Sequence, residues 1–156
     1  MKIIHIVLGK ANPQRMNGVN KMVHELASAQ FESGEQVEVW GLTKNLDSEV
    51  AKRSFKTRLF LQKRYPFNWD HSILKELRKE AGKIIVHFHG GFIPAFSRIA
   101  SALRSAKIPY CLTGHGAYNA LAMEKSKWKK RIYYGLIERP LLNGAQAVHC
   151  VGAVSY

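Results

Sequence analysis

The chain has 156 residues, of which 24 are Lys or Arg and 11 are Asp or Glu, so its formal net charge is +13. This is about the length of one domain, and 46% hydrophobic with 22% charged residues excludes wholesale disorder and collagen-like repeats. Two cysteines, Cys111 and Cys150, are too few for a disulfide scaffold and lack the spacing of a zinc site. No window approaches the ~20 apolar residues of a membrane-spanning helix, and the first residues do not form a signal peptide, so we expect a cytoplasmic protein.

The first half of the chain predicts a β-loop-α-β unit. Residues 3–8 are apolar and largely β-branched, which is typical of a strand buried on both faces of a parallel sheet. A polar stretch follows, and from Val19 the apolar residues take helical spacing until Gly34, a suitable helix stop. Residues 36–42 alternate as a second strand, whereas residues 43–68 show no regular pattern.

The second half continues the alternation of strands and helices. Asp70 is a suitable N-cap for a helix that ends near Gly82. Further helices are expected at 93–106 and 119–143, and strands at 84–88, 108–113 and 147–151. This order predicts an α/β fold with a Rossmann-like, open and mainly parallel sheet that has helices on both faces. We expect one domain over residues 1–156, belonging to a longer protein, because the chain ends soon after its last predicted strand.

Glycines and histidines gather where predicted strands end, and ligands of such sheets bind beyond these carboxyl ends. The candidates, which should converge on one edge, are Asn17, Gly18, Val19, His87, His89, Gly90, Gly91, Gly114, His115 and Gly116. Gly18 stands where the first loop becomes the first helix, whose free N–H groups and dipole suit a phosphate. An Asn-Gly turn with a helix cap explains the same residues without a ligand. The dinucleotide fingerprint and the P-loop motif are missing.

His115 is the best candidate for contacting a substrate, because the glycines on either side leave its imidazole unobstructed. A turn residue whose ring bonds to a carbonyl is an equally good interpretation. His87 is expected to be a hydrogen-bonded core histidine, and no metal site is expected, because His87 and His89 lie two residues apart on one strand with no carboxylate nearby in sequence. Cys111 and Cys150 are expected to be small buried hydrophobic residues.

The positive charge is concentrated in two segments. The last helical stretch combines Trp128 and an aliphatic stripe with Lys125, Lys127, Lys129, Lys130 and Arg131. This is the pattern of a helix on an anionic membrane surface. The stripe would also serve to pack on the sheet, so we expect its aliphatic residues mostly in the core and its lysines exposed. The basic run 52–64 contains interleaved apolar residues and is a second candidate, as a protruding loop.

Five motifs follow one another in a fixed order along essentially the whole chain. They are residues 1–6 (MKIIHI), 17–19 (NGV) before 23–27 (VHELA), 85–90 (IVHFHG), 113–116 (TGHG) and 144–151 (GAQAVHCV). In this order they resemble the amino-terminal domain of retaining glycosyltransferases of family 4, the group 1 enzymes with the two-domain GT-B fold.

The resemblance implies transfer of a sugar from a nucleotide-sugar donor, with retained anomeric configuration and without a required metal or other cofactor. It also implies that Asn17 and Gly18 approach the donor diphosphate and that His115 contacts the donor sugar near the reacting carbon. Asn17 replaces a glycine that the family more often has. The family's carboxyl-terminal domain, which carries further donor-binding residues, is absent from this sequence, so we expect a hexosyltransferase-type enzyme whose present fragment is inactive alone.

The basic segments suggest a glycan or lipid-linked acceptor, such as a growing surface polysaccharide, at the inner face of the cytoplasmic membrane. The competing interpretation is a non-catalytic basic module that binds nucleic acid or an anionic membrane. Nucleic acid is not expected as a partner, because no nucleic-acid-binding module is recognisable and the basic residues lie in two segments. An oxidoreductase is disfavoured by the missing dinucleotide fingerprint.

Overall fold

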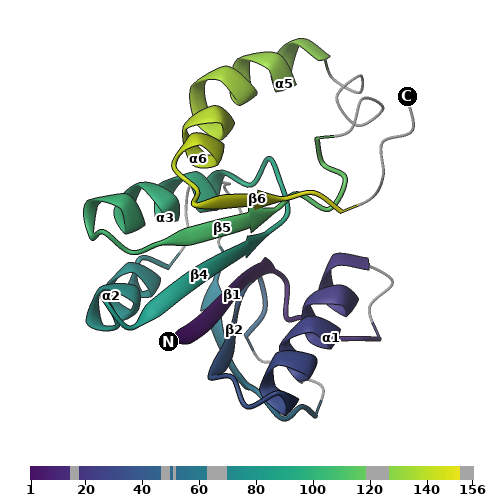
Figure 1. Cartoon of the computed structure of the whole chain (residues 1–156). Helices are drawn as coiled ribbons and strands as arrows, with labels where there is room; N and C mark the ends of the chain where they lie inside the picture. Colours follow the sequence, from purple (N-terminus) through teal and green to yellow (C-terminus); the bar gives the residue numbers. More distant parts are fainter. Residues whose placement is uncertain (15–17, 47–49, 51, 63–69, 119–126, 152–156) are drawn as a thin grey trace.

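The computed structural model describes residues 1–14, 18–46, 50, 52–62, 70–118 and 127–151. Its strands form one six-stranded sheet in the order β3-β2-β1-β4-β5-β6, and all neighbouring pairs are parallel (Figure 1). The strands are β1 (Lys2–Leu8), β2 (Val37–Thr43), β3 (Lys56–Leu61), β4 (Ile84–His89), β5 (Tyr110–Thr113) and β6 (Ala147–His149). The predicted α/β, Rossmann-like sheet is confirmed, and its strand order reverses between β1 and β4, where such folds bind ligands.

Helices cover both faces of the sheet. They are α1 (Gly18–Glu32), α2 (Ser72–Lys79), α3 (Pro94–Ser105), α5 (Lys127–Tyr133) and α6 (Arg139–Asn143), with the π-helical turn η1 (Tyr134–Glu138) between the last two. On one face Phe88 packs against Phe96 of α3, with ring centroids 4.9 Å apart. On the other face Val23 and Ala27 of α1 pack against Val39. In the described part of the chain, none of the helices has the length and apolar character needed to cross a bilayer.

The alternation of side chains along β1 and β4 decides which residues face α1. Ile4, Ile6, Val86 and Phe88 all belong to the core on the α2 and α3 face. Because successive side chains of a strand point to opposite faces, the histidines between and beside them point to the α1 face. The sheet therefore places several histidines of two neighbouring strands on the same side.

The edge strand β3 lies where no regular element was predicted. Its Phe60 is buried and stacks on Trp40 of β2 at 5.1 Å between ring centroids. Phe55, directly before the strand, is buried in the core under α1. The prediction of a protruding basic loop at 52–64 is therefore wrong for the part that the structure describes, because its aromatic residues pack in the core.

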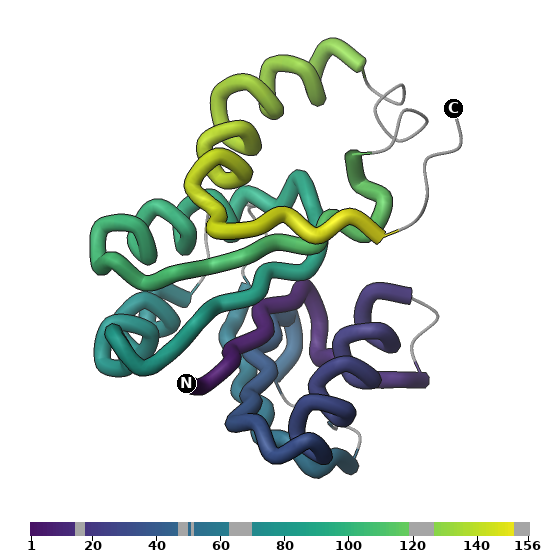
Figure 2. Tube along the Cα trace, in the orientation of Figure 1, coloured from purple at the N-terminus to yellow at the C-terminus, as the bar shows by residue number. Residues whose placement is uncertain are grey.

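The end of the chain differs from the single interrupted helix that was predicted at 119–143. Its described part is divided into α5, η1 and α6. The last two pack on α3, whereas α5 contacts mainly η1 and projects beyond the sheet (Figure 2). Trp128, Ile132 and Leu136 are 77%, 61% and 75% exposed, whereas Leu141 is buried. The prediction that the aliphatic stripe lies mostly in the core is wrong, because α5 has no sheet beneath it.

Two local predictions need correction. Cys111 is half-buried in β5 and Cys150 is exposed one residue beyond β6, so neither is a buried hydrophobic residue. Asp70 was predicted as the N-cap, but the helix starts at Ser72 with His71 directly before it, and the Asp70 carboxylate accepts a hydrogen bond from the Ser72 N–H at 2.9 Å. Asp70 therefore stabilises the helix start from two residues before it.

Candidate functional site

A cavity of about 510 Å³ lies at the edge of the sheet where strands end. It is lined by Gly18, Val19 and Met22 of α1, by His115 and Gly116 of the turn after β5, and by Val151. Its volume falls within the ~300–1,000 Å³ of small-molecule sites. Two segments that the sequence analysis singled out separately therefore line one space.

The first wall of this cavity is the amino-terminal end of α1. The buried Asn20 side chain accepts a hydrogen bond from the Ala11 N–H at 2.8 Å, which fixes the loop after β1 against the helix. A Cβ atom at Gly9 would lie 2.7 Å from the Asn20 side-chain oxygen, so this contact needs a glycine. A Cβ at Gly18, in contrast, would meet nothing within 4 Å. The space beside Gly18 is open to a ligand, while Asn17 lies outside the described residues.

The second wall is the turn that carries His115. The backbone of His115 is left-handed, with φ 49°, a conformation that costs a non-glycine residue on the order of 1 kcal/mol. The turn is closed by a hydrogen bond from the Ala117 N–H to the Gly114 carbonyl at 3.0 Å. A Cβ at Gly114 would lie 2.5 Å from the Tyr118 ring, and one at Gly91 2.7 Å from it. Both glycines are therefore needed for Tyr118 to lie behind the turn.

A buried carboxylate holds this turn from behind. Glu138 of η1 accepts hydrogen bonds at the same oxygen from the Tyr118 hydroxyl and from the Phe92 N–H, the latter at 2.8 Å. Burial raises the pKa of Glu138, against the opposing effect of these two donors. Burial and the neighbouring carboxyl also raise the pKa of Tyr118. The turns after β4 and β5 are thus both bonded to one side chain, which the sequence analysis did not identify.

A chain of hydrogen-bonded side chains leads from His115 into the protein. His115 Nε2 lies 3.1 Å from His89 Nδ1, His89 Nε2 lies 2.8 Å from His5 Nδ1, and His5 Nε2 lies 2.7 Å from Gln30 Oε1. An amide oxygen only accepts, so His5 donates from Nε2, and a neutral His5 ring then accepts at Nδ1. His89 therefore donates from Nε2, and His115 donates to it. All three rings are neutral in this arrangement.

The burial of these rings agrees with their neutral state. Burial lowers the pKa of His5 and of His115, and it lowers the pKa of His89 further with help from the neighbouring histidines. His87 is half-buried, and its pKa falls to about 3, chiefly through burial and then through His5. His87 Nε2 lies 2.7 Å from the Thr113 hydroxyl. The hydrogen bonding predicted for His87 is confirmed, although the residue is not fully buried.

Three of these residues stand close enough to hold a metal ion. One ring nitrogen from each of His5, His87 and His89 lies within 4.8 Å of the others. Among the described residues, no second group of three His, Cys, Asp or Glu side chains lies this close together. The sequence analysis missed His5, whose only signal was a histidine in an otherwise apolar strand.

The remaining candidates lie away from the cavity lining. Gly90 has a φ of +121° and donates its N–H to the Thr113 carbonyl at 2.8 Å, so it joins β4 to β5 at the strand ends. Gly91 makes room for Tyr118. Exposed on α5 are Lys127, Trp128, Lys129 and Arg131, whereas Lys130 is partly covered and lies 5.4 Å from the centre of the Phe92 ring. Lys125 lies outside the described residues.

The sheet and its order of strands define an α/β domain of the Rossmann-like class. The family model described as Glycosyltransferase Family 4 matches residues 16–154. The chain belongs to this family, and its fold is consistent with half of a GT-B fold. A comparison with curated proteins gives no match.

Among solved structures, the chain is similar to homoserine dehydrogenase of S. aureus. The crystal structure at pH 7.0 has a TM-score of 0.44 and 13% identity, and the match covers 99% of this chain and 33% of that one. The crystal structure at pH 6.5 has a TM-score of 0.43 and 13% identity, and the match covers 99% of this chain and 32% of that one. The chain thus spans about a third of the length of these structures. This likeness is too distant to inform function.

Proposed function

We propose that this chain is the amino-terminal domain of a retaining glycosyltransferase that transfers a sugar from a nucleotide-sugar donor to a glycan or lipid-linked acceptor. Membership of family 4 supports the reaction class. The observation that carries the proposal is the cavity shared by the start of α1 and the His115 turn. It offers one wall suited to a diphosphate and another suited to a sugar.

The diphosphate of the donor would lie against Gly18 and Val19. The dipole of α1 places positive potential at its amino-terminal end, where Gly18 and Val19 lie. The open space beside Gly18 lets an anion approach the backbone. This arrangement would stabilise the charge that develops on the leaving diphosphate during transfer.

The donor sugar would lie against His115. Since this ring is neutral in its bonded state, it would contribute a hydrogen bond near the reacting carbon and no charge. The left-handed backbone and the support of Tyr118 hold the ring at the cavity without a ligand. We expect transfer to need no metal ion, and we expect the 156-residue chain alone not to catalyse it.

The acceptor would lie at an anionic membrane. The strands point towards the side of the molecule on which α5 begins (Figure 1). There α5 presents exposed basic residues together with Trp128 and Ile132, a combination suited to lipid headgroups and the apolar layer beneath them. We therefore place the reaction at the membrane surface, in the synthesis of a surface polysaccharide.

The proposal is tested by titrating the chain with UDP, GDP, ADP and inorganic pyrophosphate while backbone amides are followed by NMR. We expect the tightest ligand to shift the amide signals of Gly18, Val19 and His115. Gly18→Val should weaken its binding at least about tenfold, because the side chain fills the space that a phosphate would occupy. Gly135→Ala is the control, since a Cβ there also meets nothing within 4 Å and Gly135 does not line the cavity.

Equal affinities of the Gly18→Val and Gly135→Ala variants would contradict the proposed phosphate position. Ligand-induced shifts confined to residues outside the cavity would contradict the proposed site as a whole.

A further inference from the structure

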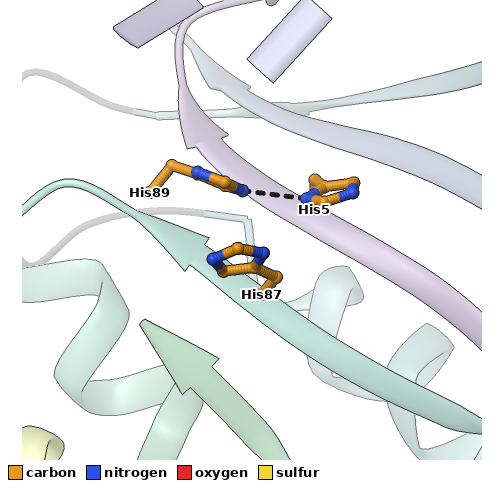
Figure 3. A group of neighbouring side chains, drawn as sticks. All are labelled: His5, His87 and His89. Carbon is orange, nitrogen blue, oxygen red and sulfur yellow. Dashed lines mark hydrogen bonds between the residues drawn. The ribbon is translucent and has the colours of Figure 1, made fainter. Parts of the chain in front are cut away.

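Three histidine rings meet on the α1 face of the sheet, beside the switch point between β1 and β4 (Figure 3). His5 of β1 is the direct partner of His87 in the strand register, and His89 follows two residues later on the same face. His5 Nδ1 and His89 Nε2 are 2.8 Å apart, and one ring nitrogen of His87 faces this pair. His5 and His89 are buried, whereas His87 is half-buried and gives the group its access to solvent.

We propose that His5, His87 and His89 form a binding site for a divalent transition metal ion of the zinc type. Three imidazole nitrogens are the donor set of zinc sites that keep a fourth position open. Co²⁺, Ni²⁺ and Cu²⁺ accept the same ligands, whereas Mg²⁺ and Ca²⁺ prefer oxygen donors, which are missing from this trio. No metal was expected because no carboxylate lies beside His87 and His89 in the sequence, but β1 supplies His5 as the third ligand.

The second nitrogen of every ring already has a hydrogen-bond partner. His5 bonds through Nε2 to Gln30 at 2.7 Å, His87 through Nε2 to Thr113 at 2.7 Å, and His89 through Nδ1 to His115 at 3.1 Å. Histidine ligands of metals almost always have such partners, which fix the orientation and tautomer of each ring. The three remaining nitrogens are those left to face a common centre.

The distances need only small changes to fit an ion. Zinc–nitrogen bonds of about 2.0–2.1 Å place the nitrogens of a tetrahedral site ~3.3 Å apart. The His5 and His89 nitrogens would separate by ~0.5 Å, and the third would approach by at most ~1.5 Å, which rotation of the half-buried His87 side chain supplies. The ion would take the place of the hydrogen shared by His5 and His89. His89 would then carry its proton on Nδ1 and donate it to His115.

The site is separate from the proposed donor cavity. None of the three histidines lines that cavity, and His115 stands between His89 and the cavity. Metal binding and diphosphate binding can therefore succeed or fail independently.

The test uses the whole 156-residue chain without a histidine tag. Zinc is titrated in competition with a chromophoric chelator, and Co²⁺ is added in parallel to record its visible d–d absorption. We expect one Zn²⁺ per chain and the intense absorption of a low-coordinate Co²⁺ site. His87→Gln should weaken zinc binding at least about tenfold and abolish this absorption. The control is His71→Gln, which removes a histidine of the same chain outside the trio.

A second variant, Gln30→Leu, leaves all three ligands in place and removes the partner of His5 Nε2. We expect it to weaken zinc binding about tenfold and to retain an altered Co²⁺ spectrum, and it decides the matter if His87→Gln does not fold. Wild-type binding of less than one Zn²⁺ per chain would overturn the proposal. Equal zinc affinities of the His87→Gln, Gln30→Leu and His71→Gln variants would also overturn it.

Discussion

Glu138 shows how much one buried carboxylate contributes to the turns behind the cavity. One of its oxygens accepts hydrogen bonds from Tyr118 and Phe92, whereas the other is buried with no partner among the described residues. A buried polar atom without a hydrogen bond costs on the order of 1–3 kcal/mol. Burial accordingly favours the protonated form and raises the pKa of this carboxyl. The buried oxygen of Glu138 thus lowers the stability of the fold locally, while the other oxygen holds the turns after β4 and β5 in place.

The pH dependence of stability follows from this raised pKa. The unfolded chain releases the Glu138 proton near pH 4.5, while the folded chain holds it to higher pH, so the stabilisation present below pH 4.5 is lost as pH rises through the folded pKa. Glu138→Gln keeps an acceptor for Tyr118 and Phe92 but does not titrate. Relative to wild type, we expect this variant to gain on the order of 1 kcal/mol between pH 4.5 and 7.5. Urea unfolding at both pH values measures the difference.

A conservative control for that experiment is Glu25→Gln, on the exposed surface of α1. Its unfolding free energy should follow that of wild type at both pH values to within ~0.5 kcal/mol. A Glu138→Gln variant that is relatively less stable at pH 7.5 than at pH 4.5 would contradict the assigned direction of the pKa change.

The candidate residues were predictable only where their position along a strand or helix carried the signal. Gly18 and His115 were identified because the ends of strands and the start of a helix can be read from apolar patterns. Asn20, Tyr118 and Glu138 were not, because their roles depend on side chains that meet from distant segments. An amide in a helix or a tyrosine after a turn has no distinguishing pattern of its own.

At the scale of elements, the edge strand β3 was not predicted because its charged residues interrupt the apolar pattern. The strand carries the exposed Lys56 and the half-buried Arg58, and charged residues are common on edge strands because charge discourages pairing with other chains. Arg58 lies 4.9 Å from the centre of the Trp40 ring and 2.9 Å from the Glu76 carboxylate of α2. The Arg58 side chain packs on the Trp40 ring, and this packing role cannot be recognised from the sequence, where arginine indicates an exposed residue.

Removing Arg58 should therefore weaken the edge of the sheet. Arg58→Ala loses the contact with the Trp40 ring and the ion pair with Glu76, and we expect it to lower the free energy of unfolding by ~1–2 kcal/mol. Lys52→Ala, a change at an exposed residue before the strand, should stay within ~0.5 kcal/mol of wild type. Denaturant unfolding at pH 7 measures both. Equal stability of the two variants would show that the arginine is merely a surface charge.

The strands buried in the middle of the sheet were predicted well, whereas the last helices were not. Runs such as β1 and β4 are apolar, short and bounded by turn residues, so pattern alone identifies them. Residues 127–143 divide into α5, η1 and α6, and Glu138, the last residue of η1, is hydrogen-bonded to the turns after β4 and β5. Tertiary contacts of this kind override local helix preference.

At the scale of the whole molecule, charge and apolar exposure coincide on α5. The chain carries a net charge of +13, yet Trp128, Ile132 and Leu136 are the large apolar residues most exposed on its last helical stretch. Each Lys or Arg near an anionic membrane contributes about 1 kcal/mol to binding. The apolar side chains would add to this by entering the headgroup layer.

Charge reversal on α5 should release the chain from anionic vesicles. We expect Lys127→Glu, Lys129→Glu and Lys130→Glu together to weaken binding to phosphatidylglycerol vesicles at least about tenfold, and added salt to weaken wild-type binding. Co-sedimentation measures the bound fraction. The matched control reverses Lys75, Arg78 and Lys83, which changes the net charge equally but lies on α2 and the segment after it.

The two triple variants separate a membrane site from diffuse attraction. Equal loss of vesicle binding in both would mean that net charge alone attracts the chain. Binding of duplex DNA that is tighter than vesicle binding, and lost with the α5 variant, would favour the nucleic-acid module over the transferase.

The direction of the hydrogen bonds along His5, His89 and His115 also decides which ligand groups the cavity favours. As long as the three histidines hold no metal ion, His115 donates its only ring proton to His89, so its remaining nitrogen, Nδ1, is a lone-pair acceptor. Such a nitrogen attracts a hydroxyl group and repels an oxygen that has no hydrogen to give. The two walls would therefore sort the parts of one bound molecule, the hydroxyl-bearing ring to one side and the anionic end to the helix.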